Sequence, residues 1–148
     1  MFARLIAFAA LAVAVSAPAA DEKDDKTTKV TGTVVIPKEV ASFEGRVVEL
    51  RLYGIDKRVA DKGADLIDKI ELKEFSHTTG KETKKEFTLG AKGTLDAANR
   101  YYVTAFVLKG DDRTHIGQAD HAKEPFNKVL TDGNPRKVTI QFKELGKK

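Results

Sequence analysis

Alternation of apolar and polar residues with a period of two is the feature that most restricts the fold of this chain. It runs over strand length in four segments, each with one mainly apolar face. The segments are Lys29 to Ile36, Arg46 to Ile55, Arg100 to Lys109 and Arg136 to Lys143. The stretch 56–65 allows one helical turn but shows no sustained helical stripe. The sequence therefore predicts an all-β protein.

The strongest of these segments also predict the core. Their alternation turns one set of side chains toward the interior and leaves the intervening residues outside. The predicted core residues are Val48, Leu50, Leu52, Val103, Ala105, Val107, Val138, Ile140 and Phe142.

Weaker strands fill the intervals, at 67–75, 84–90 and 113–120. The first is so charged that we expect it at a sheet edge, where like charges discourage pairing with other copies. Turn-forming sequences at 109–112 and 131–136 separate the later strands. About seven short strands with such turns are typical of an antiparallel β-sandwich, Ig-like or transthyretin-like, or of a barrel.

One tyrosine favours the sandwich. Tyr101 follows Leu95 by six residues and leads into a strong strand. Sandwich domains often carry a tyrosine corner, in which the hydroxyl is hydrogen-bonded to upstream backbone. The alternative is that Tyr101 only caps a strand.

The first twenty residues predict export. Arg4 precedes an apolar run of about 11 residues, and Ala17-Pro18-Ala19 fits a small-x-small cleavage site, as in a secretory signal peptide. A membrane anchor is the alternative, but a spanning helix needs roughly 20 apolar residues. We expect a signal peptide at 1–20, a flexible charged tether at 21–29 and a β-sandwich domain at 30–144. The predicted location is the periplasm or the cell exterior, with no membrane span after cleavage.

Composition limits the partners. Removal of the signal peptide takes away one positive charge and leaves a net charge of +3, too balanced to indicate a nucleic-acid partner. The sequence has no cysteine, so the domain does not rely on disulfides and lacks the residue that a bacterial lipoprotein acylates.

Two of the three histidines lie close together in the sequence, in Arg113 to His121. On one extended strand His115 and His121 would share a face but lie about 20 Å apart, and Asp120 would point away. Two histidines that share a metal on a strand are typically two residues apart. We therefore predict no metal site and no cofactor.

Catalytic motifs are also missing. There is no cysteine nucleophile, no G-x-S-x-G elbow and no glycine-rich phosphate loop. We predict no catalytic residues. The remaining enzymatic hypothesis is a transthyretin-like hydrolase, for which Arg113 and His115 would be the best candidates.

Binding hypotheses rest on aromatic side chains. We select Tyr53, Tyr102, Phe106 and His115 as candidate ligand-binding residues. The leading hypothesis is a non-enzymatic module that binds an envelope or secreted protein through this face or a strand edge. The alternative is a carbohydrate or small-ligand module, which needs a solvent-exposed platform formed by two or more of Tyr53, Tyr101, Tyr102 and Phe106. The oligomeric state is left open.

The sequence resembles a family of bacterial envelope proteins. The segment from Val129 to Pro135, "VLTDGNP", followed by Val138, is the most specific part, and the resemblance extends over about Val30 to Phe142. It is similar to the YbaY/YscW-type family. The resemblance implies a small β-sandwich in the cell envelope with no catalytic residues. Some members are pilotins, lipoproteins that help a type III secretin ring reach the outer membrane; this chain lacks their lipid-attachment cysteine.

Overall fold

The computed structural model describes residues 25–124 and 126–146, and its regular secondary structure is all β-strand, as predicted. The signal peptide predicted at 1–20 lies outside the described residues. Within them no helix is long and apolar enough to cross a membrane. The strands are β1 (Val30–Ile36), β2 (Phe43–Asp56), β3 (Asp65–His77), β4 (Thr83–Leu89), β5 (Asn99–Lys109), β6 (Asp112–Ala119), β7 (Asn127–Val129) and β8 (Lys137–Glu144).

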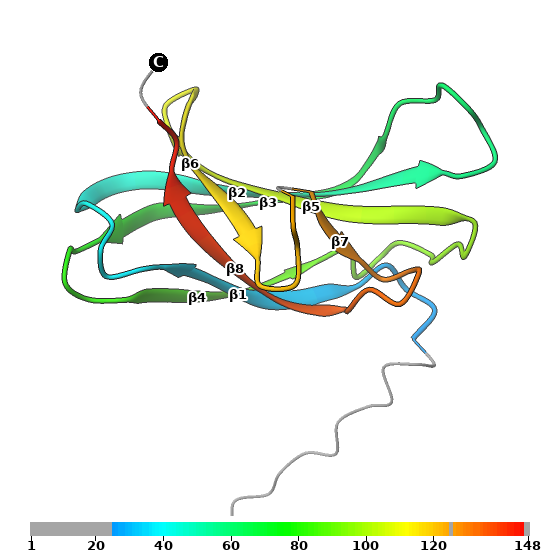
Figure 1. Ribbon diagram of the computed structural model, residues 1–148, viewed down its shortest axis with the longest axis horizontal. Coiled ribbons are helices and arrows are strands. Elements are labelled where there is room, and N and C mark those ends of the chain that lie inside the picture. Colours follow the sequence, from blue (N-terminus) through cyan, green and yellow to red (C-terminus); the bar gives the residue numbers. More distant parts are fainter. Residues whose placement is uncertain (1–24, 125, 147–148) are drawn as a thin grey trace, which may run out of the picture.

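One sheet folds back on itself and forms two layers. Its strand order is β3-β2-β5-β6-β8-β1-β4, with β7 paired to β5. In Figure 1, β3, β2 and β5 form one layer and β1 and β4 the other, while β6 and β8 cross between them. The expected antiparallel arrangement holds for every pair of these strands except β1 and β8, which are parallel. These are the first and last strands of the chain, so no turn sequence between neighbouring strands could predict their contact.

The space between the layers is the core, and the alternation predicted it. All nine residues expected inside are buried, with at most 4% of their surface exposed. The charged strand 67–75 falls within β3, at one end of the sheet, as expected. The two predicted turns separate β5 from β6 and precede β8.

The domain begins earlier than the sequence predicts. Thr28 is buried, donates from its hydroxyl to Gly90 O at 2.7 Å and donates from its backbone N–H to Gly93 O at 3.0 Å. Arg136 donates to the carbonyl of Thr27 at 2.8 Å. The stretch 25–29, expected to belong to a free tether, is therefore packed on the domain, because these bonds satisfy its backbone in place of water.

The tyrosine corner is confirmed. The Tyr101 side chain is 2% exposed, and its hydroxyl accepts a hydrogen bond from the backbone N–H of Asp96 at 2.9 Å. This bond fastens the loop before β5 to the core side of the same strand.

The sheet forks beside β5. β6 pairs with β5 from Phe106 to Lys109 and then diverges toward β8, and the short strand β7 takes its place from Tyr101 to Val103. β7 could not be predicted from the sequence, because three residues are too few to show a period.

The side chain of Asn127 fills this fork. It is fully buried; its Oδ1 accepts from the Ala119 N–H at 2.7 Å, and its Nδ2 donates to Val103 O at 3.1 Å and Gly117 O at 3.3 Å. One amide thus satisfies backbone groups on β5 and β6 that the diverging strands no longer satisfy for each other.

We expect Asn127→Asp to destabilise the protein by about 3 kcal/mol, because a buried carboxylate cannot donate to the two carbonyls. Urea unfolding monitored by circular dichroism measures the change. Asn134→Asp is the matched control, since Asn134 donates only one bond, to Thr131 O in a partly exposed turn. Equal losses in the two variants would contradict the role assigned to Asn127.

Candidate functional site

The outer face of the β3-β2-β5 layer carries a row of apolar side chains. Strand register places Tyr53 of β2 opposite Leu66 of β3 on one side and opposite Tyr102 of β5 on the other. The Tyr53 and Tyr102 rings stack at 5.2 Å, and the Phe126 ring meets Tyr102 edge-on at 5.3 Å. We call these four residues the aromatic patch.

The exposure of the aromatic patch is unusual for such side chains. Leu66 is 51% and Phe126 52% exposed, and both tyrosines are half-buried. Their neighbours along the strands, Leu52 and Tyr101, point inward and are buried. Alternation along β2 and β5 therefore forces Tyr53 and Tyr102 outward, where cross-strand packing brings their rings together.

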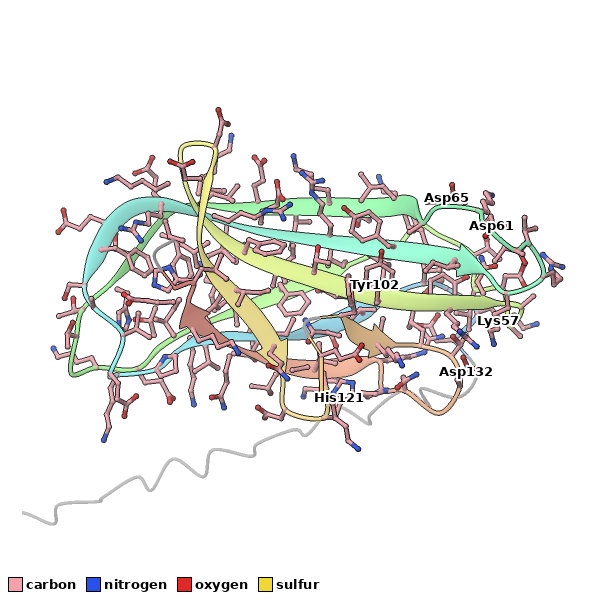
Figure 2. The ribbon with its side chains drawn as sticks, turned by 45° about the horizontal axis from the view of Figure 1, so that its top comes forward. Lys57, Asp61, Asp65, Tyr102, His121 and Asp132 are labelled. Atoms are coloured by element: carbon pink, nitrogen blue, oxygen red, sulfur yellow. The ribbon has the colours of Figure 1, made fainter. Side chains whose placement is uncertain are left out.

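A groove runs beside the patch. It encloses about 710 Å³ between the start of β5, β7 and the turn before β8, and its lining includes Arg100, Tyr102, Phe126, Lys128 and Asp132. A second hollow of about 270 Å³ shares Phe126 and Lys128 with it and extends toward His121. Figure 2 shows Tyr102, His121 and Asp132 around this part of the molecule.

Charges border the groove. Lys57 Nζ lies 2.7 Å from Asp132 Oδ1, and Arg100 Nε lies 3.8 Å from Oδ2 of the same carboxylate. The hydrogen bond from Lys57, aided by its charge and that of Arg100, lowers the pKa of Asp132, so this carboxylate stays ionised. Lys128 forms no salt bridge with any residue among those described. The groove thus combines an apolar wall with a charged rim.

The structure separates the four residues selected from the sequence. Tyr53 and Tyr102 come together in the patch. Phe106 lies on the same face of β5 but farther along it, with the Arg113 guanidinium 4.0 Å from its ring centre. His115 lies on the inner face of β6 and is 2% exposed, so a ligand on the outer face would not reach it.

Sequence reasoning missed three residues of this region. Phe126 and Lys128 belong to or adjoin β7, whose position depends on the fork, and Leu66 faces Tyr53 only because of an irregularity in the β2–β3 register. Phe126 had one signal, as a lone aromatic residue in the polar stretch 123–128. The other two had none.

His115 belongs to a buried cluster around Phe43. The Phe43 ring lies 5.3 Å from the His115 ring and 5.8 Å from the His77 ring. His115 Nδ1 is 2.8 Å from the Thr114 hydroxyl, which accepts from Arg46 and donates to Val107 O. His115 Nδ1 therefore carries a proton and donates to Thr114.

The other nitrogen of His115 has no hydrogen bond. Nε2 is buried and lies 3.8 Å from Glu144 Oε1. Burial lowers the pKa of His115, and the charges of Arg46 and His77 lower it further, while Glu144 opposes them. At neutral pH this imidazole is therefore uncharged in the folded protein.

The remaining reactive groups do not converge. His121 is exposed beyond the end of β6, where its Nε2 donates to Lys128 O at 2.9 Å. Arg113 and His115 point to opposite faces of β6, which removes the geometric basis for a hydrolase built on them. Residues 25–124 and 126–146 contain no group of three or more His, Cys, Asp or Glu side chains that could hold a metal ion.

Comparison with known proteins relates the fold to one class. No family model matches the sequence, and no curated protein matches it. Among solved structures, an alternative pilotin from the type II secretion system of Vibrio cholerae shares the fold, with a TM-score of 0.59 and 23% identity. The match covers 82% of this chain and all of the pilotin chain. A pilotin-like fold is therefore established, and the resemblance to the YbaY/YscW-type family stays a prediction.

The neutral state of His115 predicts a pH dependence. Its pKa is lowered on folding, so as the pH falls below the ordinary value of 6.5 the unfolded chain is protonated before the folded one. This contribution to stability is complete above pH 6.5 and is lost as the pH falls below it. We expect His115→Leu to reduce this loss of stability on acidification. Urea unfolding at pH values above and below 6.5 measures it.

The exposed His121 supplies the control. His121→Gln should keep the pH dependence of the unchanged protein. If His115→Leu and the unchanged protein lost stability in parallel on acidification, another group would be responsible.

Proposed function

We propose that this chain is an exported, non-enzymatic module of the cell envelope that binds a protein component of a secretion assembly. The observation that carries the proposal is the aromatic patch with its groove, on a fold shared with a secretion pilotin. Export through the predicted signal peptide would deliver the domain to the compartment where such assemblies lie.

The patch has the anatomy of a protein-binding surface. Tyrosine and phenylalanine contribute large contact areas at little entropic cost and are frequent in the centres of interfaces. A charged network adjoins the patch: Arg51 Nε lies 2.9 Å from Glu49 Oε1, and Lys69 Nζ lies 3.1 Å from Glu71 Oε1. An apolar centre with a charged rim is the arrangement that specific interfaces show.

The ring geometry favours a protein over a sugar. A carbohydrate stacks on the free face of an aromatic ring, whereas Tyr53 and Tyr102 stack on each other and Phe126 contacts Tyr102. The exposed edges of these rings, with Leu66 and Phe126, suit aliphatic side chains of a polypeptide. Soluble oligosaccharides are therefore the comparison ligands for any binding assay.

A photo-crosslinking amino acid in place of Phe126 tests the proposal in cells that export the protein. We expect an adduct with a secretion-system protein, identified by mass spectrometry. Thr139, exposed on the outer face of β8, is the control position and should give no such adduct. The same adducts from both positions, or none from position 126, would refute the proposed surface.

The partner found in this way allows a quantitative test. Phe126→Ser should weaken its binding about tenfold, a loss typical of an interface aromatic residue. Stability should change by less than about 1 kcal/mol, because the side chain is half exposed. Calorimetric titration and thermal unfolding measure the two effects, and unchanged affinity would count against the patch.

A further inference from the structure

The two ends of the folded sheet differ in a way that suggests a second binding surface. β3 and β4 occupy the ends of the strand order, and each pairs with one neighbour in the described part of the chain. β3 is unsuited to further pairing: Glu74 has a left-handed backbone with φ 54°, and its register with β2 is broken three times. β4 pairs with β1 without a register shift.

The hydrogen bonds of β1 show which groups of β4 are free. Thr31 N–H donates to Arg136 O at 3.0 Å, so the backbone groups of Thr31 point toward β8. Successive residues of a strand point their backbone groups to opposite sides, so Gly32 and Val34 point toward β4. Their partners there are Phe87 and Lys85.

The intervening residues of β4 must then point outward. Lys84, Glu86 and Thr88 direct their N–H and C=O groups away from β1, toward the side of β4 that has no strand partner among the described residues. Their side chains are exposed, and residues 83–89 contain no proline and no positive φ. This is the geometry that an added strand requires.

Charge distinguishes the possible occupants. Lys81 and Lys85 form no salt bridge with a described residue, and Lys85 projects from the inner-facing side of the edge, opposite Val34 in register. An inward-facing lysine discourages pairing with an apolar strand. An acidic strand would instead neutralise both lysines.

A second copy of the chain is a poor occupant for the same reason. Two β4 edges could pair antiparallel through the outward groups of Lys84, Glu86 and Thr88 in two central registers. One register sets Glu86 opposite Glu86 of the other copy, and the other sets Lys85 opposite Lys85. Like charges directly opposite each other destabilise a strand pair.

We infer that β4 accepts an extended, acidic segment of a partner protein as an additional strand. The backbone groups of Lys84, Glu86 and Thr88 form the ladder, and Lys81 and Lys85 select acidic side chains. This surface lies in the opposite layer from the aromatic patch and does not depend on it.

The test uses the full exported chain and a synthetic peptide that alternates Glu with Val. We expect the peptide to slow amide hydrogen exchange at Lys84, Glu86 and Thr88, as followed by NMR. Lys85 and Phe87, already bonded to β1, should change little. A peptide with Lys in place of Glu should bind at least tenfold more weakly at low salt. Equal binding of both peptides would overturn the acidic preference.

Two changes isolate the backbone ladder. Glu86→Pro removes an outward N–H without removing a bond to β1 and should abolish protection at this edge. Methylation of alternate backbone nitrogens of the synthetic peptide removes hydrogen-bond donors from the ligand instead. This keeps the test valid if the proline variant does not fold. Binding that survives the methylation, or that leaves the three amides unprotected, would overturn the inference. Phe126→Ser should have no effect on binding of the peptide at β4. A failure of this inference can therefore be told apart from a failure of the proposed function of the aromatic patch.

Discussion

The side chain of Asn127 is the constraint on which the arrangement of this protein depends. β5 is longer than either partner on that side, and β6 leaves it in order to reach β8. Three hydrogen bonds from one buried amide bridge the gap, at 2.7, 3.1 and 3.3 Å. Without these bonds the buried carbonyls of Val103 and Gly117 would lose the Asn127 amide as a donor. The free-energy cost of burying them unpaired would destabilise the fork.

The same amide organises the outer surface. Because Asn127 points inward, alternation along β7 points Lys128 outward beside Tyr102, and the preceding Phe126 reaches the Tyr102 ring. The aromatic patch therefore spans β3, β2, β5 and the residue that precedes β7. The short strand β7 thus directs a hydrogen-bonded polar side chain inward and its neighbours outward, so an exposed apolar surface can lie on a stable sheet.

The alternation of apolar and polar residues explains which parts of the fold could be predicted from the sequence. Alternation predicted seven strands and the buried faces of the strongest of them, since side-chain direction is local. Tyr101 and its corner were recognisable because both bonded partners lie within six residues. The fork, the parallel pairing of β1 with β8 and the meeting of Tyr53 with Leu66 depend on contacts distant in sequence, so no local pattern carries them. His115 looked available for binding because alternation alone does not say which of two faces is buried.

The most direct measurement is the nuclear Overhauser effect between the Tyr102 and Phe126 rings, compared in the unchanged protein and in Asn127→Ser. We expect a strong effect in the unchanged protein. In the variant it should be lost or greatly weakened while the core resonances of β2 and β5 stay in place, because the short serine side chain cannot bridge β5 and β6. A ring contact of equal strength in both proteins would show that Asn127 does not position the aromatic patch.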